Sequence, residues 1–595
     1  MNYLFVMPRF IQKSGEPYMF PLGMAYVSAS LKQTRSTVFC LNLNVNLGKL
    51  EEELKKAIYD HKIDVIATGG LSPHFLQIRN IISTARRIKP DIITMAGGGM
   101  VTATPEVIME GIPELDIGMI SEGEITIKEL ADALDNQGRI NEVKGIVYRN
   151  DSGKPVRTQP RKDIEDLDAL PFPDYDGFQY DGKNEISICT SRSCPYNCSF
   201  CFHTCGKKYR ARSLDNVFQE IDWLVDKYNV KSLGILDELF STNNDKMEKF
   251  CNRIEPYHIR WSCQMRVDRI NVNILKKMKK AGCVSLSFGI ESADNRILKS
   301  MEKHTTIEQV EIALQMAREA GICPFGNLLL GDKEDTVESF MKCLEWYQSH
   351  PDILLGFNKI LVLPGSHLYE YAVAKGMIKD EVRYLEEGNF VINITRMTDE
   401  EYKQCVEIMD QAVVNREYPL QDMLVTKVDL DKRKVLVKGR CSLCGEEIVC
   451  YSNDFVGTQN GSCENCGKNF TINLYNHYLD TMEEKLELLW KEKAVVLWGM
   501  GNEGLKMLHQ SNIIKKDNIY LVDKNENKQR MMEGKMVYPT EKVNEIHPNM
   551  ILIGTNAPVT NTAIKQFIEN TYPSVIEVYN LNQYLFDVMV GEEKE

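Results

Sequence analysis

The sequence has no stretch of about 18 consecutive apolar residues, the length that would suggest a membrane-spanning helix. Its first residues also lack the basic flank, long apolar run and small-residue cleavage site of a secretory signal peptide. A formal net charge of −13 argues against an extended nucleic-acid groove, which needs clustered Lys and Arg. We therefore expect a cytoplasmic protein with no membrane span and no nucleic-acid partner.

The sequence contains 17 cysteines but no export signal that would place them in an oxidising compartment. This combination favours metal ligation over a disulfide framework. At 595 residues the chain also exceeds what one hydrophobic core usually serves, so we expect several domains. The predicted divisions are 1–150, a linker 151–180, 181–375, a helical extension 376–425, 426–475 and 476–595.

Residues 1–150 alternate short apolar runs with amphipathic stretches of helical period, which predicts a doubly wound parallel α/β sheet. The expected strands are Tyr3–Met7, Thr37–Leu41, Val65–Gly69, Ile92–Ala96 and Ile117–Ile120. Ligands of such sheets bind beyond the carboxyl ends of the strands. The loops after these strands are therefore the first places to look for a binding site.

A second β/α series follows the polar, Pro-rich segment that we expect to be a linker. Its expected strands are Glu185–Thr190, Ser232–Leu236, Arg260–Gln264, Val284–Phe288, Pro324–Leu330 and Phe357–Leu363. Six β/α units form a partial TIM-like barrel that is open at one side. The loops after its strands lie at the catalytic face of such a barrel.

Cys194, Cys198 and Cys201 follow the first of these strands, in the sequence CPYNCSFC. Their thiolates can bind one 4Fe–4S cluster and leave one iron free for a small molecule. A closed structural zinc site normally needs four ligands, and Cys205 or His203 would then be the fourth. We expect the iron–sulfur cluster, because no fourth ligand at a regular spacing accompanies the three cysteines.

This motif, with an aromatic residue before its last cysteine, resembles that of the radical S-adenosylmethionine (SAM) superfamily. The resemblance implies that the open iron binds the amino and carboxylate groups of SAM, whose reductive cleavage gives a 5′-deoxyadenosyl radical. It also implies SAM contacts from residues after later strands, which could otherwise be ordinary caps and turns. These residues are Asp237 and Glu238 for the amino group and Gly289, Glu291 and Ser292 for the ribose.

Glycines cluster after strands of the N-terminal domain, where they let the backbone approach a large planar ligand. The fold alone would suit FMN, a nucleotide or no ligand. Beside the cysteine motif, however, the order of these segments resembles the cobalamin-binding domains that precede many radical SAM barrels. The residues implied are Gly97, Gly98, Gly99, Glu122, Gly123 and Glu124, while Ser72 and Thr102 could bond the cofactor's nucleotide tail. No Asp-x-His-x-x-Gly sequence follows the first strand, so we expect cobalt without that histidine ligand.

Two Cys-x-x-Cys-Gly sequences lie in residues 426–475. Their cysteines are Cys441, Cys444, Cys463 and Cys466. Four thiolates in this pairing suit a tetrahedral zinc ion and predict a small zinc-ribbon-like module. A rubredoxin-like iron site or an auxiliary cluster is the alternative. Because four ligands close the site, we expect its role to be structural.

Residues 476–595 return to β/α alternation, which predicts a C-terminal Rossmann-like domain. Gly499, Gly501 and Gly504 follow a strand and open a helix, and Asp523 ends the next strand. This context fits a nucleotide-binding fold, with phosphate at the helix N-terminus and the carboxylate on a ribose, although a lone glycine pattern is weak evidence. A degenerate half-fold used for docking is the alternative.

The resemblance implies a radical SAM enzyme, and we expect a cobalamin-dependent methyltransferase acting on an unactivated carbon of a small, carrier-linked or nucleotide-linked substrate. A flavodoxin or ferredoxin would supply electrons. A cyclase or rearrangement enzyme with the same cofactors is the alternative, and a non-enzymatic sensor or scaffold is another. A methylthiotransferase would need three further cluster cysteines in the N-terminal domain, where only Cys40 occurs before residue 150. The sequence assigns no catalytic residue.

Overall fold

The computed structural model describes the chain except for a set of short segments. The segments left out are 11–17, 19, 137, 181–185, 241–242, 352, 389, 415, 417, 430–433, 443, 453–458, 464, 466–467, 502–503, 505–506, 509, 526–527, 533, 555–557, 573–574, 576 and 591–595. The described residues form two units, Met1–Ser349 with Leu354–Met409, and His350–Ile353 with Asp410–Glu595. Among the helices described, none combines the length and the apolar character needed to cross a membrane.

The first unit begins with a seven-stranded sheet in the order β2-β1-β3-β4-β5-β6-β7. Its strands are β1 (Asn2–Met7), β2 (Thr37–Asn42), β3 (Val65–Gly69), β4 (Ile93–Gly97), β5 (Ile117–Met119), β6 (Ile146–Arg149) and β7 (Pro155–Arg157). Strands β1 to β5 pair in parallel as predicted, whereas β6 and β7 extend the sheet in antiparallel pairing. β7 lies in the segment expected to be a linker, and its three residues are too few to show a strand period.

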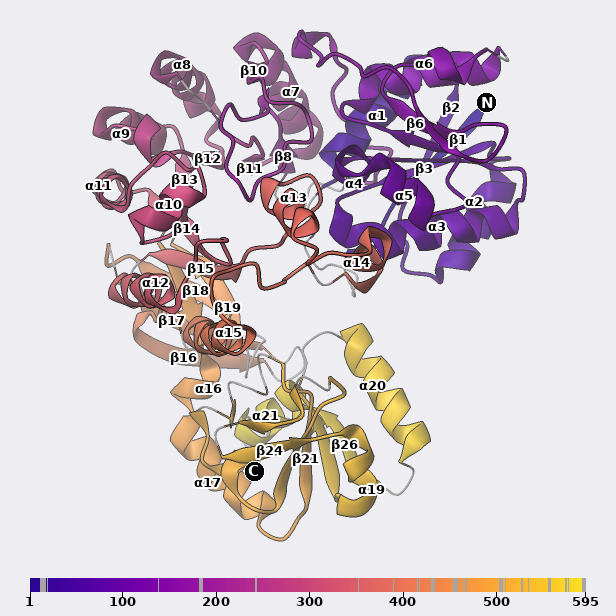
Figure 1. Cartoon of the computed structure of the whole chain (residues 1–595). Coiled ribbons are helices and arrows are strands. Elements are labelled where there is room, and N and C mark those ends of the chain that lie inside the picture. The colour runs from indigo at the N-terminus through magenta and orange to yellow at the C-terminus, as the bar shows by residue number, and fades with distance from the viewer. Residues whose placement is uncertain are drawn as a thin grey trace. The chain divides into compact units, whose positions relative to one another are not determined.

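Helices cover both faces of this first sheet. They are α1 (Leu22–Lys32), α2 (Leu50–Asp60), α3 (Phe75–Ile88), α4 (Gly99–Ala103), α5 (Pro105–Gly111) and α6 (Gly123–Asp135). Figure 1 shows α1 and α6 on one side of the sheet and α2 and α3 on the other. Strands β1, β3 and β4 are therefore buried almost throughout, which is why their sequences are continuous apolar runs.

The second sheet of this unit has six strands, all parallel, in the order β15-β14-β13-β12-β11-β8. They are β8 (Ile186–Ile188), β11 (Ser232–Ile235), β12 (Arg260–Met265), β13 (Cys283–Glu291), β14 (Cys323–Leu330) and β15 (Leu354–Lys359). Because each strand pairs with the next one along the chain, the sheet is the predicted open, partial barrel. A short pair, β9 (Ser191–Arg192) and β10 (Arg210–Ala211), brackets the cysteine loop.

Helices alternate with the strands of the second sheet. They are α7 (Leu214–Tyr228), α8 (Asn244–Ile254), α9 (Val272–Lys280), α10 (Asn295–Ser300), α11 (Ile307–Glu319) and α12 (Val337–Ser349), followed by α13 (His367–Ala374), α14 (Glu381–Glu387) and α15 (Asp399–Val414). Trp261 of β12 packs on Phe250 of α8, and Phe357 of β15 packs on Phe340 of α12. These buried strand residues face the helices, so the residues between them face the opposite, inner side of the sheet.

The second unit contains small antiparallel sheets and a mostly parallel one. The strands β16 (Gln421–Asp429), β17 (Lys434–Arg440) and β18 (Glu447–Ser452) form one sheet, and β19 (Gln459–Ser462) pairs with β20 (Asn469–Ile472). The larger sheet has the order β23-β24-β22-β21-β25-β26, with strands β21 (Val495–Trp498), β22 (Ile519–Val522), β23 (Met531–Met532), β24 (Lys535–Tyr538), β25 (Met550–Ile553) and β26 (Glu577–Asn580). Its helices include α17 (Leu479–Trp490), α19 (Val543–Ile546), α20 (Pro558–Thr571) and α21 (Leu581–Val590), which is the predicted β/α alternation.

Candidate active site

Cys194, Cys198 and Cys201 lie on one loop between β9 and β10, directly after the first strand of the second sheet. The Cys201 N–H donates to the Cys198 carbonyl at 3.0 Å, which closes a turn between these two cysteines. The Ser199 N–H donates to the Met301 carbonyl at 3.0 Å, and the Ser199 carbonyl accepts the Leu368 N–H at 3.1 Å. Segments far along the barrel therefore fix the position of the cysteine loop.

The three thiols are partly buried and lie near the cationic side chain of Lys303. Burial raises the pKa of Cys194 and Cys198 and raises that of Cys201 to about 12, while Lys303 opposes the shift. Thiols with such raised pKa values stay protonated at neutral pH unless a further positive charge is added. Bound iron would add that charge, so the loop suits metal ligation better than a free nucleophilic cysteine.

Two arginines hold Tyr196, the aromatic residue between the first two cysteines. The Arg266 guanidinium lies 3.6 Å from the centre of the Tyr196 ring, and Arg269 Nη2 donates to the Tyr196 hydroxyl at 2.9 Å. His203 Nε2 lies 2.9 Å from the Tyr196 carbonyl oxygen, and its Nδ1 lies 2.9 Å from the Glu238 carboxylate. The sequence contains no spacing that would have revealed Arg266 or Arg269.

The two acidic residues after β11 have different environments. Asp237 is buried, and its carboxylate accepts hydrogen bonds from the backbone N–H and hydroxyl groups of Thr190 and Ser191. These contacts join the ends of the first two barrel strands. The Glu238 side chain is 35% exposed and faces His203. Of the pair predicted to contact the SAM amino group, Glu238 is thus the residue with an accessible carboxylate.

The residues predicted to contact the SAM ribose lie at the carboxyl end of β13. Glu291 has a φ of +66°, and Lys303 Nζ donates to its carboxylate at 2.6 Å. Although burial opposes the shift, the charges of Glu291 and Cys198 raise the pKa of Lys303. Gly289 lies so close to Lys303 and Glu291 that a Cβ would collide with both, and Ser292 is buried. The structure therefore brings this segment next to the cysteine loop.

The glycines Gly97, Gly98 and Gly99 follow β4 at the carboxyl edge of the first sheet. Gly98 has a φ of +86°, and a Cβ there would lie 2.8 Å from the Gly70 carbonyl oxygen, so glycine is required. Thr102 donates to the Gly98 carbonyl at 2.9 Å, and Ser72 is buried in the loop after β3. The predicted cobalamin contacts from these loops share one edge of the sheet.

Glu122 and Glu124, two further predicted cobalamin contacts, are buried in an ion-pair network. Arg192 of β9 donates to Glu122 at 2.7 Å and to Glu124 at 2.5 Å, and Arg210 of β10 donates to Glu122 at 2.7 Å. Gly123 between them lies against α1. The network ties α6 of the first sheet to the strands that bracket the cysteine loop. The sequence marked the two glutamates but gave no indication of their arginine partners.

Phe202, the residue after Cys201, lies where the glycine loop and the barrel meet. A Cβ at Gly99 would lie 3.6 Å from the Phe202 ring and 3.0 Å from Thr204. Gly365, with a φ of +89° in the segment after β15, packs directly against the Phe202 ring. The loop predicted to bind cobalamin and the loop predicted to bind the cluster are therefore neighbours.

Two family models match the parts of the chain that contain these two loops. The Radical SAM superfamily model matches residues 188–347, which include the cysteine loop. A B12 binding domain model matches residues 9–131, which include the glycine loop. The chain therefore contains a B12-binding domain followed by a radical SAM domain. These two domains imply a 4Fe–4S cluster, SAM and cobalamin as cofactors.

The relatives of this radical SAM protein are named for different activities. The uncharacterized methyltransferase PH0819 of Pyrococcus horikoshii is 29% identical over 367 residues, which cover 60% of this chain and 79% of the relative. The anaerobic magnesium-protoporphyrin IX monomethyl ester cyclase of Rubrivivax gelatinosus is 27% identical over 416 residues, covering 67% of this chain and 74% of the relative.

Two solved structures share the fold of this radical SAM protein. The methyltransferase TsrM of Kitasatospora setae aligns with a TM-score of 0.55 at 18% identity, covering 63% of this chain and 77% of that one. The cobalamin-dependent enzyme OxsB aligns with a TM-score of 0.52 at 18% identity, covering 82% of this chain and 67% of that one. At this identity the likeness establishes the fold only.

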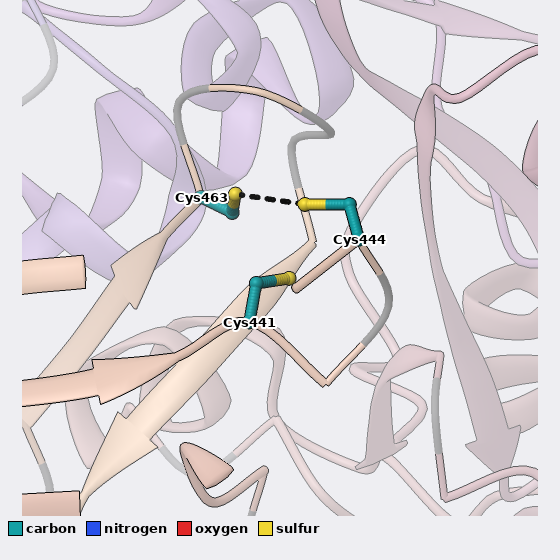
Figure 2. Close-up of side chains that lie close together, drawn as sticks. All are labelled: Cys441, Cys444 and Cys463. Atoms are coloured by element: carbon teal, nitrogen blue, oxygen red, sulfur yellow. Dashed lines mark hydrogen bonds between the residues drawn. The ribbon is translucent and has the colours of Figure 1, made fainter. Parts of the chain in front are cut away.

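The second unit of this radical SAM protein gathers three of the four predicted zinc ligands. Cys441 follows β17 and Cys463 follows β19, while Cys444 lies in the turn after Cys441 (Figure 2). The sulfurs of these residues all lie within 4.8 Å of one another, and those of Cys444 and Cys463 are 3.6 Å apart. The prediction for Cys466 falls outside the described residues.

The glycine segment after β21 is held by hydrogen bonds to residues that follow the next strand. Asp523, at the end of β22, accepts the Met500 N–H at 2.6 Å, and Lys528 Nζ donates to the Met500 carbonyl at 2.6 Å. Gly499 has a φ of +97°, and a Cβ at Gly504 would lie 2.5 Å from the Gly499 carbonyl oxygen. Asp523 therefore contacts, through Met500, the loop that contains the predicted nucleotide-binding glycines Gly499, Gly501 and Gly504.

Proposed function

We propose that this radical SAM protein is a cobalamin-dependent methyltransferase acting on an unactivated carbon of a small-molecule substrate. The observation that carries the proposal is the meeting of the two cofactor loops at Phe202, between Gly99 and Gly365. A radical made at the cysteine loop would therefore form close to a methyl donor held at the glycine loop. The methyltransferase named among the relatives supports the same activity.

We assign the cofactors to residues as follows. The 4Fe–4S cluster would bind Cys194, Cys198 and Cys201, because three thiolates leave one iron for SAM. The SAM amino group would face Glu238, and its ribose would face the Gly289, Glu291 and Ser292 segment. Cobalamin would lie on the edge formed by Ser72, Gly97, Gly98, Gly99 and Thr102. When bound, these groups would supply the substrate radical and the methyl group.

The protein's own residues would hold the two cofactor loops in one arrangement. The carboxylates of Glu122 and Glu124 bind Arg192 and Arg210 in a buried network, which keeps the first sheet at a fixed distance from the cysteine loop. Removing one partner of a buried ion pair costs about 3–5 kcal/mol, so this junction resists opening. The ring of Phe202 lies between Gly99 and Gly365, where it would shield a reactive radical from water.

A second candidate function is a cyclisation or rearrangement without methyl transfer. The observation that favours it is the relative named as an anaerobic cyclase, which aligns over 67% of this chain. The two functions differ in their products from SAM. A methyltransferase that uses both chemistries releases S-adenosylhomocysteine and 5′-deoxyadenosine, whereas a cyclase with the same cofactors releases only 5′-deoxyadenosine.

The test uses full-length protein, purified and reconstituted without oxygen and supplied with SAM, cobalamin and a cytoplasmic electron donor such as flavodoxin or ferredoxin. We expect a four-iron EPR signal that changes when SAM is added, a bound corrinoid, and both SAM products in the presence of substrate. Production of 5′-deoxyadenosine without S-adenosylhomocysteine would favour the cyclase. A preparation without a four-iron centre would contradict both functions.

The second unit would add a structural zinc ion and a nucleotide-binding loop. We propose that zinc binds Cys441, Cys444, Cys463 and Cys466, because three described sulfurs already lie within one coordination sphere of each other. Metal analysis should then find one zinc per chain, retained in a Cys194→Ala variant that lacks the cluster. Iron in place of zinc would contradict this assignment. The Gly499 loop remains our proposed nucleotide site.

A further inference from the structure

One face of the second sheet packs against helices. The opposite, inner face carries fewer bulky side chains than is usual. In TIM-like barrels, bulky branched side chains fill the interior. Here many inner positions of neighbouring strands carry small or polar side chains, with Phe325, Leu329 and Leu354 as bulky exceptions. In register across the sheet, Ser262 lies beside Ser285, Gln264 beside Ser287, Gly289 beside Asn327, and Asn327 beside Gly356. Bulky side chains therefore occupy only some positions of the inner face.

Three amide side chains stand on this inner face. Gln264 and Asn358 are exposed, and Asn327 is half-buried. Asn358 Nδ2 donates to Asn327 Oδ1 at 3.1 Å, and the absence of a side chain at Gly356 provides the space for this contact. Within the part of the chain that the structure describes, this is the one hydrogen bond of the two asparagine side chains. Donors on Asn327 and an acceptor on Asn358 thus remain for a ligand.

The amides lie close to the proposed radical centre. Asn327 is the register neighbour of Gly289, and Gly289 lies against the Lys303 and Glu291 pair beside Cys198. Because adjacent strands are about 4.8 Å apart, Asn327 and Asn358 lie one and two strands from the SAM-binding segment. A molecule bound to both amides would therefore present its carbons toward the cofactors.

The two buried cations near these amides are already paired with carboxylates. Lys303 binds Glu291 at 2.6 Å, and Arg266 binds Asp268 at 2.9 Å. An anionic substrate would have to compete with these carboxylates, and an apolar one would leave the amides without partners, which is costly once water is excluded. Amides offer both donors and acceptors without charge, as hydroxyl and amide groups of a ligand require.

We propose that the substrate is a neutral molecule with several hydroxyl or amide groups, bound on the inner face of the second sheet by Asn327, Asn358 and Gln264. This inference rests on the proposed methyl transfer and narrows its substrate class. It disfavours macrocyclic carboxylates, phosphorylated metabolites and hydrocarbon lipids as substrates of this chain.

The test separates a cell extract of the encoding organism, at pH 7, into neutral hydrophilic, anionic, cationic and organic-soluble fractions. Each fraction is added to reconstituted full-length protein with SAM, cobalamin and reductant, and S-adenosylhomocysteine and 5′-deoxyadenosine are measured by mass spectrometry. We expect the neutral hydrophilic fraction to raise both products. Asn327→Leu and Asn358→Leu, which keep the side-chain size but remove the amide, should each reduce this stimulation about tenfold.

Asn136→Leu, the same change on an exposed asparagine of the first sheet's α6 end, is the matched control and should respond like the wild type. The SAM-bound cluster EPR signal checks that each variant is folded, and Asn327→Ser or Asn358→Ser replaces any variant that lost it. Stimulation of both products by the anionic, cationic or organic fraction instead would overturn the substrate class alone. No S-adenosylhomocysteine with any fraction would overturn the proposed function, and this inference with it.

Discussion

The two sheets of the first unit are both built from parallel strands, but they bury their faces differently. In the first sheet, β1, β3 and β4 are buried almost completely, because helices cover both sides. In the second sheet, β12 and β14 alternate between buried and accessible residues. A parallel sheet with one accessible face buries less apolar surface than a sheet covered on both sides. We propose that the accessible face of the second sheet binds the substrate.

The two sheets also differ in the place that each offers to its proposed cofactor. The first sheet offers only its edge, where Gly98 lets two backbone segments approach closely. The second sheet offers a loop above its edge and an inner face beneath that loop. We conclude that a covered sheet can hold a large cofactor at its rim, whereas an uncovered one can enclose a reacting molecule.

The largest effect is expected at the loop above the uncovered face. Cys198→Ala should lower 5′-deoxyadenosine formation by about a thousandfold or more, because two thiolates no longer retain the four-iron centre that reduces SAM. Iron content, the EPR signal and product formation measure the effect. Cys205→Ala, in the same segment, is the control and should retain iron. Loss of iron in the control would point to a site closed by four ligands.

The two faces of β12 should differ strongly in their tolerance of truncation. Trp261→Ala, on the face under α8, should lower the free energy of unfolding by about 3–5 kcal/mol, because it leaves a large cavity. Gln264→Ala, three residues later on the inner face, should change it by less than about 0.5 kcal/mol. Urea denaturation followed by circular dichroism compares them. Equal destabilisation would mean that the inner face is packed.

The edge of the first sheet should tolerate no side chain at Gly98. Gly98→Ala combines a positive φ with a Cβ 2.8 Å from the Gly70 carbonyl oxygen, and we expect a cost of about 1–3 kcal/mol together with loss of bound corrinoid. Gly153→Ala has a similar φ of +76° but no neighbour within 4 Å, so it isolates strain from collision. The corrinoid absorbance of both variants measures retention. Equal corrinoid in the two variants would argue against a role for this edge.

Much of this arrangement could be predicted because buried parallel strands are apolar runs that sequence patterns reveal directly. The five parallel strands of the first sheet and the six of the second were found in this way, with ends that differ by a few residues. The antiparallel strands β6 and β7 were missed, since strands of four and three residues carry little periodicity. The cysteine loop could be predicted from the spacing of Cys194, Cys198 and Cys201 alone.

Partners that depend on folding could not be predicted. Arg192 and Arg210 are ordinary basic residues in the sequence, and only the fold brings them to Glu122. Asp237 follows a strand as a ligand-binding acid would, yet the hydrogen bonds to Thr190 and Ser191 give it a structural use. The amides of the inner face were also missed, because Asn327 is followed by three leucines and shares its face of β14 with Phe325 and Leu329, so the strand shows no polar alternation.

The smallest effect concerns the segment after β14, a turn that contains Asp332 and Asp335. Asp335 is buried, accepts the Gly331 and Asp332 N–H groups and the Ser339 hydroxyl, and burial raises its pKa from 3.8 to about 6. A raised acid pKa favours the protonated folded state, so its contribution to stability is complete below pH 3.8 and is lost as the pH rises through about 6. Between these values stability should fall by at most about 1.4 kcal/mol per pH unit. Thermal unfolding of the wild type and of Asp335→Asn across this range tests the assignment, because the variant should have a flatter profile. An unchanged slope would place the titration elsewhere, and Asp335 would then keep only its role in fixing the turn at the edge of the uncovered sheet.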